Sequence, residues 1–118
     1  MASDGDKNFL DQLEKVYSSN GDYYLHIDKE ASMQVVQSES GAVKFSRAKP
    51  KDRGVPPFVL ELNQEGNMSI RDNKDEAVFS TDTRNRGISP YTLVVTDEGR
   101  LLLTDSTNEE IWKTPISA

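Results

Sequence analysis

The strongest constraint on the fold of this chain is an internal repeat. Residues 53–72 read RGVPPFVLELNQEGNMSIRD, and residues 86–105 read RGISPYTLVVTDEGRLLLTD, so the second stretch is the first one moved along by 86 − 53 = 33 residues. The match continues through Glu76/Glu109 and Thr81/Thr114. Chance does not produce agreement over roughly thirty positions, so the chain contains copies of one structural unit.

A third, weaker copy lies upstream, in GDYYLHIDKEASMQVV. It aligns Tyr23 with Phe58 and Leu25 with Leu60, at an offset of 58 − 23 = 35 residues. We therefore expect three units, over residues 20–52, 53–85 and 86–118, preceded by an N-terminal segment over residues 1–19.

Each unit has the pattern of half-buried strands, because apolar and polar residues alternate with period two. If Asn63 pairs with Asn67, a three-residue loop places Leu62 opposite Met68 on one side of the hairpin. Such a loop usually ends in the left-handed region, which suits the glycine at position 66 and its counterpart at position 99. The first unit has an alanine at position 31 instead, so its turn is expected to be strained or differently shaped.

Three apolar hairpin faces, none of which can close a core alone, must bury against one another. The sequence therefore predicts an all-β fold in which three small sheets surround a shared axis. Phe45, Phe79 and Trp112, which lie near the ends of the three units, are expected to meet near that axis.

The N-terminal segment does not fit the repeat. Two interpretations remain open: a short amphipathic helix, or an irregular segment that packs along the sheets. The helix is suggested by apolar residues at helical spacing, namely Phe9, Leu10, Leu13, Val16 and Tyr17.

Composition narrows the function. The chain has 118 residues and a net charge of −6, which disfavours nucleic acid and anionic membrane surfaces as partners. It has no cysteine and a single histidine, His26, which is expected to face outward on a strand. We therefore expect no enzyme, no metal site and no cofactor. The start of the chain lacks the pattern of a signal peptide, which favours a cytoplasmic location or export by another route.

The pattern L-x-L-x-x-E-G-N-x-x-I-x-D, followed by A-V-F-S-T in the second copy or I-W-K-T in the third, resembles the bulb-type mannose-binding lectins. The resemblance covers roughly residues 20 to 115 and implies a β-prism II fold, which consists of three four-stranded sheets with pseudo-threefold symmetry. It also implies sugar sites read from the pattern Q-x-D-x-N-x-V-x-Y in each copy.

No copy carries that sugar pattern intact, and the second copy keeps only its asparagine, Asn67. Strand parity places the pattern positions on an outward face, so a sugar held there needs a rearranged set of hydrogen bonds. The second copy is the best preserved. The sugar-binding candidates are Asn63, Glu65, Asn67, Ser69 and Arg71 in the second copy, and Asp28, Glu30, Ser32, Gln34 and Val36 in the first; the third copy offers Thr96, Glu98, Arg100, Leu102 and Thr104.

Two functions follow from the resemblance. The first is a lectin-type module that binds a mannose-type glycan, and the alternative is a prism that has lost its sugar sites and serves protein interaction or assembly. A basic stretch at residues 44–54 is either a soluble loop or a docking patch for an acidic partner. A homodimer through the C-terminal strand, residues 109–118, is also expected, because nothing follows that strand to hold it in place.

Overall fold

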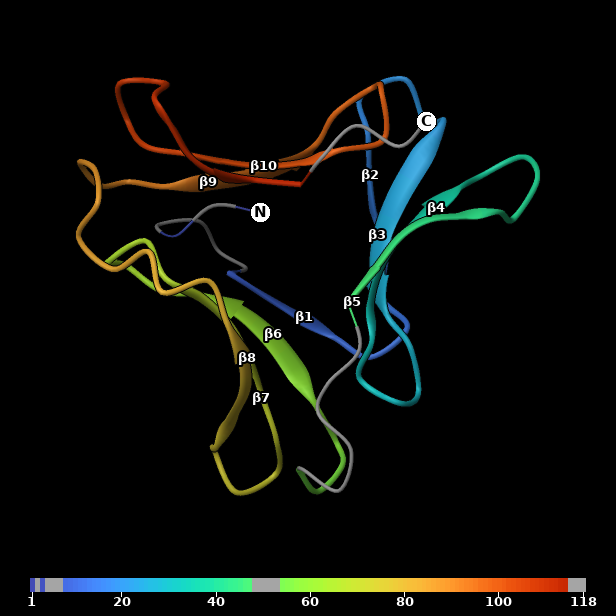
Figure 1. Ribbon diagram of the computed structural model, residues 1–118, viewed down its shortest axis with the longest axis horizontal. Helices are drawn as coiled ribbons and strands as arrows, with labels where there is room; N and C mark the ends of the chain where they lie inside the picture. Colours follow the sequence, from blue (N-terminus) through green and yellow to red (C-terminus); the bar gives the residue numbers. More distant parts are fainter. Residues whose placement is uncertain (2, 4–7, 48–53, 115–118) are drawn as a thin grey trace.

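The computed structural model describes residues 1, 3, 8–47 and 54–114, and these residues form strands and turns without a helix. The strands build three antiparallel sheets arranged around a shared centre (Figure 1). The first sheet has the order β2-β3-β4-β5, the second β1-β6-β7-β8 and the third β11-β10-β9. The strands are β1 (Phe9–Asp11), β2 (Val16–Tyr17), β3 (Tyr23–Ile27), β4 (Met33–Gln37), β5 (Val43–Arg47), β6 (Val59–Leu62), β7 (Met68–Arg71), β8 (Ala77–Ser80), β9 (Thr92–Val95), β10 (Leu101–Thr104) and β11 (Glu110–Lys113).

The three sheets correspond to the three copies of the repeat. Strands β9, β10 and β11 begin and end 33 residues after β6, β7 and β8. The all-β prism predicted from the sequence is therefore confirmed. Because the described residues contain no helix, none of them forms a helical membrane span.

The third sheet differs from the expectation of four strands. Only three strands form it among the described residues, but Met1 lies along the free edge of β9. The Leu93 N–H donates to Met1 O at 2.7 Å, and the Met1 amine donates to Leu93 O at 3.0 Å. Ser3 continues this pairing through a bond from its N–H to Tyr91 O.

The N-terminal helix considered from the sequence was wrong. Residues 9–11 instead form an edge strand on β6, and residues 16–17 form one on β3. Of the five apolar residues at helical spacing only Leu10 is fully buried, whereas Leu13 and Tyr17 are 51% and 53% exposed. Each sheet offers an edge with unpaired backbone groups, and satisfying these edges outweighs a short helix whose apolar face has little to cover.

The hairpin register is as predicted. Leu62 pairs with Met68, and the Asn63 N–H donates to Asn67 O at 3.0 Å. Gly66 has φ of 85°, and its counterpart in the third copy has φ of 86°. Ala31 adopts the same left-handed conformation, with φ of 64°, so the first turn keeps its shape and carries the strain.

Most of the buried core is aliphatic, and Phe45, Phe79 and Trp112 do not form the expected aromatic centre. Phe45, Phe79 and Trp112 are only half-buried. They lie on β5, β8 and β11, which are edge strands, whereas the first two strands of each copy supply the centre. Two other aromatic residues are buried in the core instead. Phe58 is 4% exposed, and Tyr91 is 2% exposed and donates from its hydroxyl to Gly87 O at 2.7 Å.

Candidate functional site

Three of the predicted sugar-binding residues lie together in the second copy. Asn67, Ser69 and Arg71 line a shallow groove of about 440 Å³ on the outer face of β7 and β8, which we call the second-copy groove. Sequence reasoning missed the rest of its lining, because these residues come from β8 and the loop that follows it rather than from the sugar pattern. They are Ala77, Ser80, Asp82 and Arg84.

Asn67 serves the structure of the groove as well as its surface. Its Oδ1 accepts from the Thr83 N–H at 3.0 Å, and its Nδ2 donates to Ser80 Oγ at 3.1 Å. The side chain therefore holds residues 80–83 against β7. Strand parity places Asn67 on the outward face, and these bonds give its side chain a structural role there as well.

Asn63 does not line the groove, because it is the first residue of the hairpin turn. Its Oδ1 accepts from the N–H groups of Glu65 and Asn67, both at 3.0 Å. Asp28 makes the same turn in the first copy, with bonds from the N–H groups of Glu30 and Ser32 at 2.9 and 2.8 Å. The first position of the sugar pattern is thus occupied by a turn-forming residue.

The charged residues of the second copy pair with one another. The Glu65 carboxylate lies 3.3 Å from Nε of Arg84, a residue that lines the groove, so Glu65 forms an ion pair at its rim. Arg71 donates from Nη1 to Asp75 O at 2.9 Å and lies 4.0 Å from the Glu61 carboxylate. The groove consequently presents guanidinium donors next to amide and hydroxyl groups.

Several candidates of the first copy are buried or engaged, and Ser69 of the second copy is likewise only 3% exposed. Ser32 and Val36 are 8% and 3% exposed, although parity places them on the outward face. Gln34 is engaged by His26, with 2.8 Å between Gln34 Oε1 and His26 Nε2. Only Glu30 remains fully exposed on its turn, so the first copy does not present its pattern residues as a set.

In the third copy, Leu102 and Thr104 line a groove of about 440 Å³ on the outer face of β9 and β10, together with Val94 and Pro90. Thr96 is a turn residue whose hydroxyl accepts from the Arg100 N–H at 3.1 Å. Glu98 is exposed on that turn. The lining of this groove contains no arginine, whereas Arg71 and Arg84 line the second-copy groove. The third-copy groove is therefore the more apolar of the two.

Two carboxylates at equivalent positions anchor the second turn of their copies. A hydrogen bond from the Thr107 hydroxyl at 2.7 Å, reinforced by backbone N–H groups of Ile88, Glu109 and Thr107, lowers the pKa of Asp105 to about 2. The pKa of Asp72 is also lowered, chiefly by the hydrogen bond from the Glu76 N–H. These carboxylates shape the loops beside the grooves.

Comparisons with known proteins support the fold. No protein-family model matches the chain, and no curated protein sequence matches it. Among solved structures, the monomeric monocot mannose-binding lectins from Gastrodia elata match at 17% identity and a TM-score of 0.80, over 100% of this chain and 96% of theirs. A Japanese Marasmius oreades lectin matches at 20% identity and a TM-score of 0.76, over 92% of this chain and 86% of that lectin. A mannose-specific lectin from Crocus vernus matches at 15% identity and 0.70, over 98% and 93%.

The fold is therefore the β-prism of the bulb-type mannose-binding lectins, which the sequence resemblance had indicated. These sequence identities are too low to transfer binding sites from the solved lectins to this chain. The similarity therefore shows the fold alone. What this chain binds has to be argued from its own residues.

Proposed function

We propose that this chain is a carbohydrate-binding module that takes a mannose-type glycan in the second-copy groove. The observation that carries the proposal is the gathering of Asn67, Ser69 and Arg71, three positions of the sugar pattern, in one groove. The groove offers amide, hydroxyl, guanidinium and carboxylate groups, which match the mixed donor and acceptor character of sugar hydroxyls. The fold shared with mannose-binding lectins supports the same function.

The binding chemistry of this groove differs from the family pattern. Arg71 stands where the pattern has tyrosine, and it supplies several N–H donors in place of one hydroxyl. Ser69 replaces the valine, so an apolar contact with the sugar ring is lost. Binding therefore depends on hydrogen bonds, and we expect weak affinity for a single sugar unit.

A glycan array with a matched pair of variants tests the proposal. Ala77 is exposed and lines the groove, so Ala77→Tyr fills the groove without removing a hydrogen bond. Glu110 is its counterpart 33 residues later, so Glu110→Tyr is the control. Glycan binding by the wild type that Ala77→Tyr abolishes and Glu110→Tyr preserves is the expected result. Binding that survives Ala77→Tyr would place the sugar on another surface.

The alternative function is a protein-interaction or assembly scaffold. It is favoured by one observation: several pattern residues are engaged in the structure itself, namely Asn63 and Asp28 in turns and Asn67 in holding residues 80–83. A wild-type protein that binds no glycan on the array, yet is folded, would favour this alternative.

A further inference from the structure

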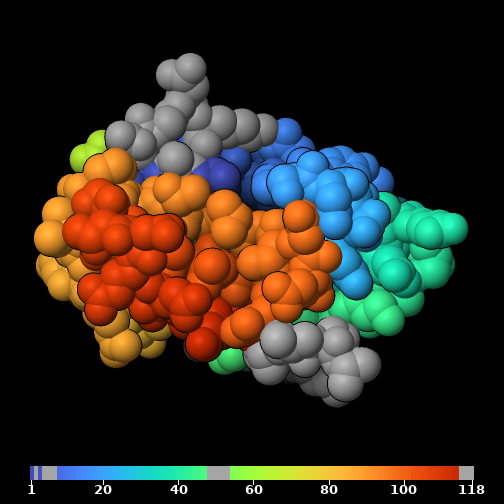
Figure 2. Space-filling view, turned by 90° about the horizontal axis from the view of Figure 1, so that it is seen from above, coloured from blue at the N-terminus to red at the C-terminus, as the bar shows by residue number. Residues whose placement is uncertain are grey.

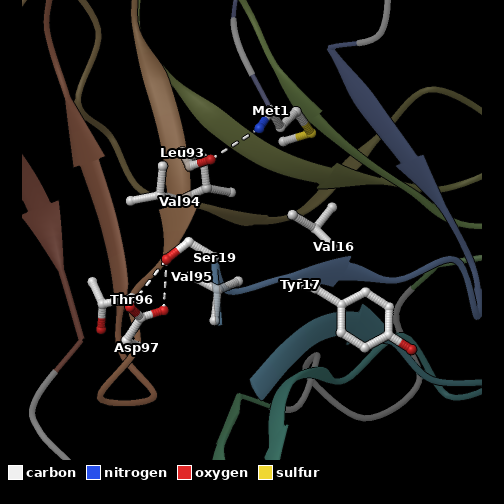
Figure 3. Close-up of a pocket in the computed structure, with 9 residues that line it drawn as sticks. All are labelled: Met1, Val16, Tyr17, Ser19, Leu93, Val94, Val95, Thr96 and Asp97. Atoms are coloured by element: carbon white, nitrogen blue, oxygen red, sulfur yellow. Dashed lines mark hydrogen bonds between the residues drawn. The ribbon is translucent and has the colours of Figure 1, made fainter. Parts of the chain in front are cut away.

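A further groove lies at the seam between the first and third copies, away from the residues of the sugar pattern that face outward on β7. Figure 2 looks onto the third copy, in orange and red, where it meets the first copy, in blue. The groove has a volume of about 440 Å³, within the range of small-molecule sites. We call it the seam groove, and Figure 3 shows its lining: Met1, Val16, Tyr17, Ser19, Leu93, Val94, Val95, Thr96 and Asp97.

Val95 brings unpaired backbone groups to this groove. The Thr96 N–H donates to the O of Arg100, the residue before β10, whereas the N–H and C=O of Leu93 bond to Met1 on the other side. By alternation, the N–H and C=O of Val95 point away from β10, toward the free edge of β9. Within the residues that the structure describes, neither group has a hydrogen-bond partner.

The other two copies show that this position normally has a partner. In the second copy, the Leu62 N–H donates to Asn8 O at 2.9 Å, and Leu62 O accepts from Asn8 Nδ2 at 3.0 Å. In the first copy, Ile27 O accepts from the Leu13 N–H at 2.8 Å. Val95 is only 5% exposed, and backbone groups at so buried a residue favour a bound partner.

A fixed carboxylate lies at one end of the groove. Asp97 accepts from Ser19 Oγ at 2.9 and 3.0 Å and from the Asn20 N–H at 3.0 Å, so the first copy holds it in place. Figure 3 shows the bonds from Ser19. A carboxylate has about four lone-pair positions, which leaves acceptor capacity for a ligand hydroxyl.

The side of the groove formed by β2 is apolar and exposed. Tyr17 is 53% exposed, and Val94 across the groove is 38% exposed. The strand pairings show that the second copy has Asp11 at the position of Tyr17 and Glu61 at that of Val94. The fold does not require apolar residues at these positions, and together they give this seam an apolar surface that a ligand can contact.

We propose that the seam groove binds a neutral saccharide as a second sugar site. A pyranose ring presents an apolar C–H face, which fits against Tyr17, beside hydroxyls that both donate and accept. One hydroxyl donates to Asp97, and others pair with the N–H and C=O of Val95. The Asp97 carboxylate disfavours an anionic sugar. This site uses no residue of the second-copy groove and stands whether or not that groove binds sugar.

The test is an amide NMR titration of the full chain with the methyl glycosides of mannose, glucose and galactose. The expected result is a saturable shift of the Val95, Thr96 and Asp97 amides with at least one of these sugars. Tyr17→Ala should weaken this binding about tenfold, and Ala77→Tyr should leave it unchanged. Because Tyr17 is exposed, its variant should keep the wild-type melting temperature and amide spectrum.

Three outcomes would overturn the proposal. The first is the absence of any shift at these amides with sugar up to roughly 50 mM, because a dissociation constant above that concentration is too weak for a functional site. The second is sugar binding that Tyr17→Ala does not change. The third is binding of a peptide instead of a sugar, probed with the sequence of residues 8–13, part of which pairs with β6. If the seam groove binds no sugar in the titration but Ala77→Tyr still abolishes glycan binding on the array, only the seam-groove proposal is contradicted. The proposed function of the second-copy groove then stands.

Discussion

Gly66 lies where the hairpin turn of the second copy meets Tyr91 of the third copy. A side-chain carbon built on Gly66 would lie 2.5 Å from the ring of Tyr91, and its φ of +85° is itself unfavourable for other residues. The turn glycine therefore has two roles, one in backbone conformation and one in close packing between copies.

We expect Gly66→Ala to destabilise the protein by about 2–5 kcal/mol, as the sum of backbone strain and overpacking. Gly21 is the matched control, because it has φ of +78° with no atom within 4 Å of a built side-chain carbon. Gly21→Ala should cost only the strain, about 1–2 kcal/mol. Equal losses in urea unfolding would show that the Tyr91 contact is not tight.

Asn67 is expected to matter for stability before it matters for binding. Asn67→Ala leaves the N–H of Thr83, a residue only 1% exposed, without its acceptor and should cost about 1–3 kcal/mol. The exposed neighbour in the sugar pattern provides the control: Glu65→Ala should change stability by no more than about 0.5 kcal/mol. A thermal melt of each variant measures both, and an unchanged melting temperature for Asn67→Ala would contradict this role.

At the scale of elements, the N-terminal segment joins the three sheets. Met1 pairs with β9, β1 pairs with β6, and β2 pairs with β3, so the segment adds an edge to each copy in turn. Figure 1 shows β1 and β2 on two different sheets. One piece of chain thus supplies hydrogen-bond partners to edge groups in all three copies.

This arrangement separates two leucines that helical spacing would treat alike. Leu10 is 3% exposed, so Leu10→Ala should cost about 2–5 kcal/mol. Leu13 is 51% exposed, so Leu13→Ala should stay within about 0.5 kcal/mol of the wild type. Chemical denaturation of both variants measures the difference, and similar losses would favour a helix with one buried face.

The turn anchored by Asp105 should be sensitive to acid. Its folded pKa of about 2 lies below the ordinary 3.8, so the carboxylate stabilises the fold above about pH 4. That contribution is lost as the pH falls through the folded pKa. The difference in melting temperature between the wild type and Asp105→Asn should therefore be largest near neutral pH and should shrink between about pH 4 and pH 2. If the difference in melting temperature stayed constant over this range, the charge of the Asp105 carboxylate would not be the source of the stabilisation.

At the scale of the whole molecule, the C-terminal strand β11 bears on whether two copies of the chain form a homodimer. Strand β11 pairs with β10 of its own chain and forms the edge of the third sheet, and residues 115–118 of the expected dimer contact lie outside the described residues. The edge of β11 is free for a second copy among the described residues, and we propose a homodimer through it.

Sedimentation of the wild type at high micromolar concentration tests this dimer. Lys113 is exposed on β11, so Lys113→Pro removes an edge N–H without removing an apolar side chain from the core. We expect a dimer for the wild type and a monomer for this variant, with an unchanged spectrum of the folded state. A wild-type monomer would contradict the proposal.

Much of the fold was predictable from local sequence. The repeat, the period-two strands and the turn glycines led to the three sheets and to the Leu62–Met68 register, because these depend on neighbours along the chain. The candidate site was predictable only in part. Ser69 and Arg71 lie on β7 and Asn67 directly precedes it, and their parity placed them together. Asp82 and Arg84 reach the same groove from a loop that no pattern connects to them.

The sequence by itself determined the repeating unit, its strands and its turns, since alternation and glycine conformation are local properties. Only the tertiary structure decided what the N-terminal residues do, because their partners are sheet edges distant in sequence. It also decided which aromatic residues are buried, since burial depends on which strand lies at an edge. The seam groove exists only because Tyr17 of the N-terminal segment and Val95 of the third copy, distant in sequence, line the same space.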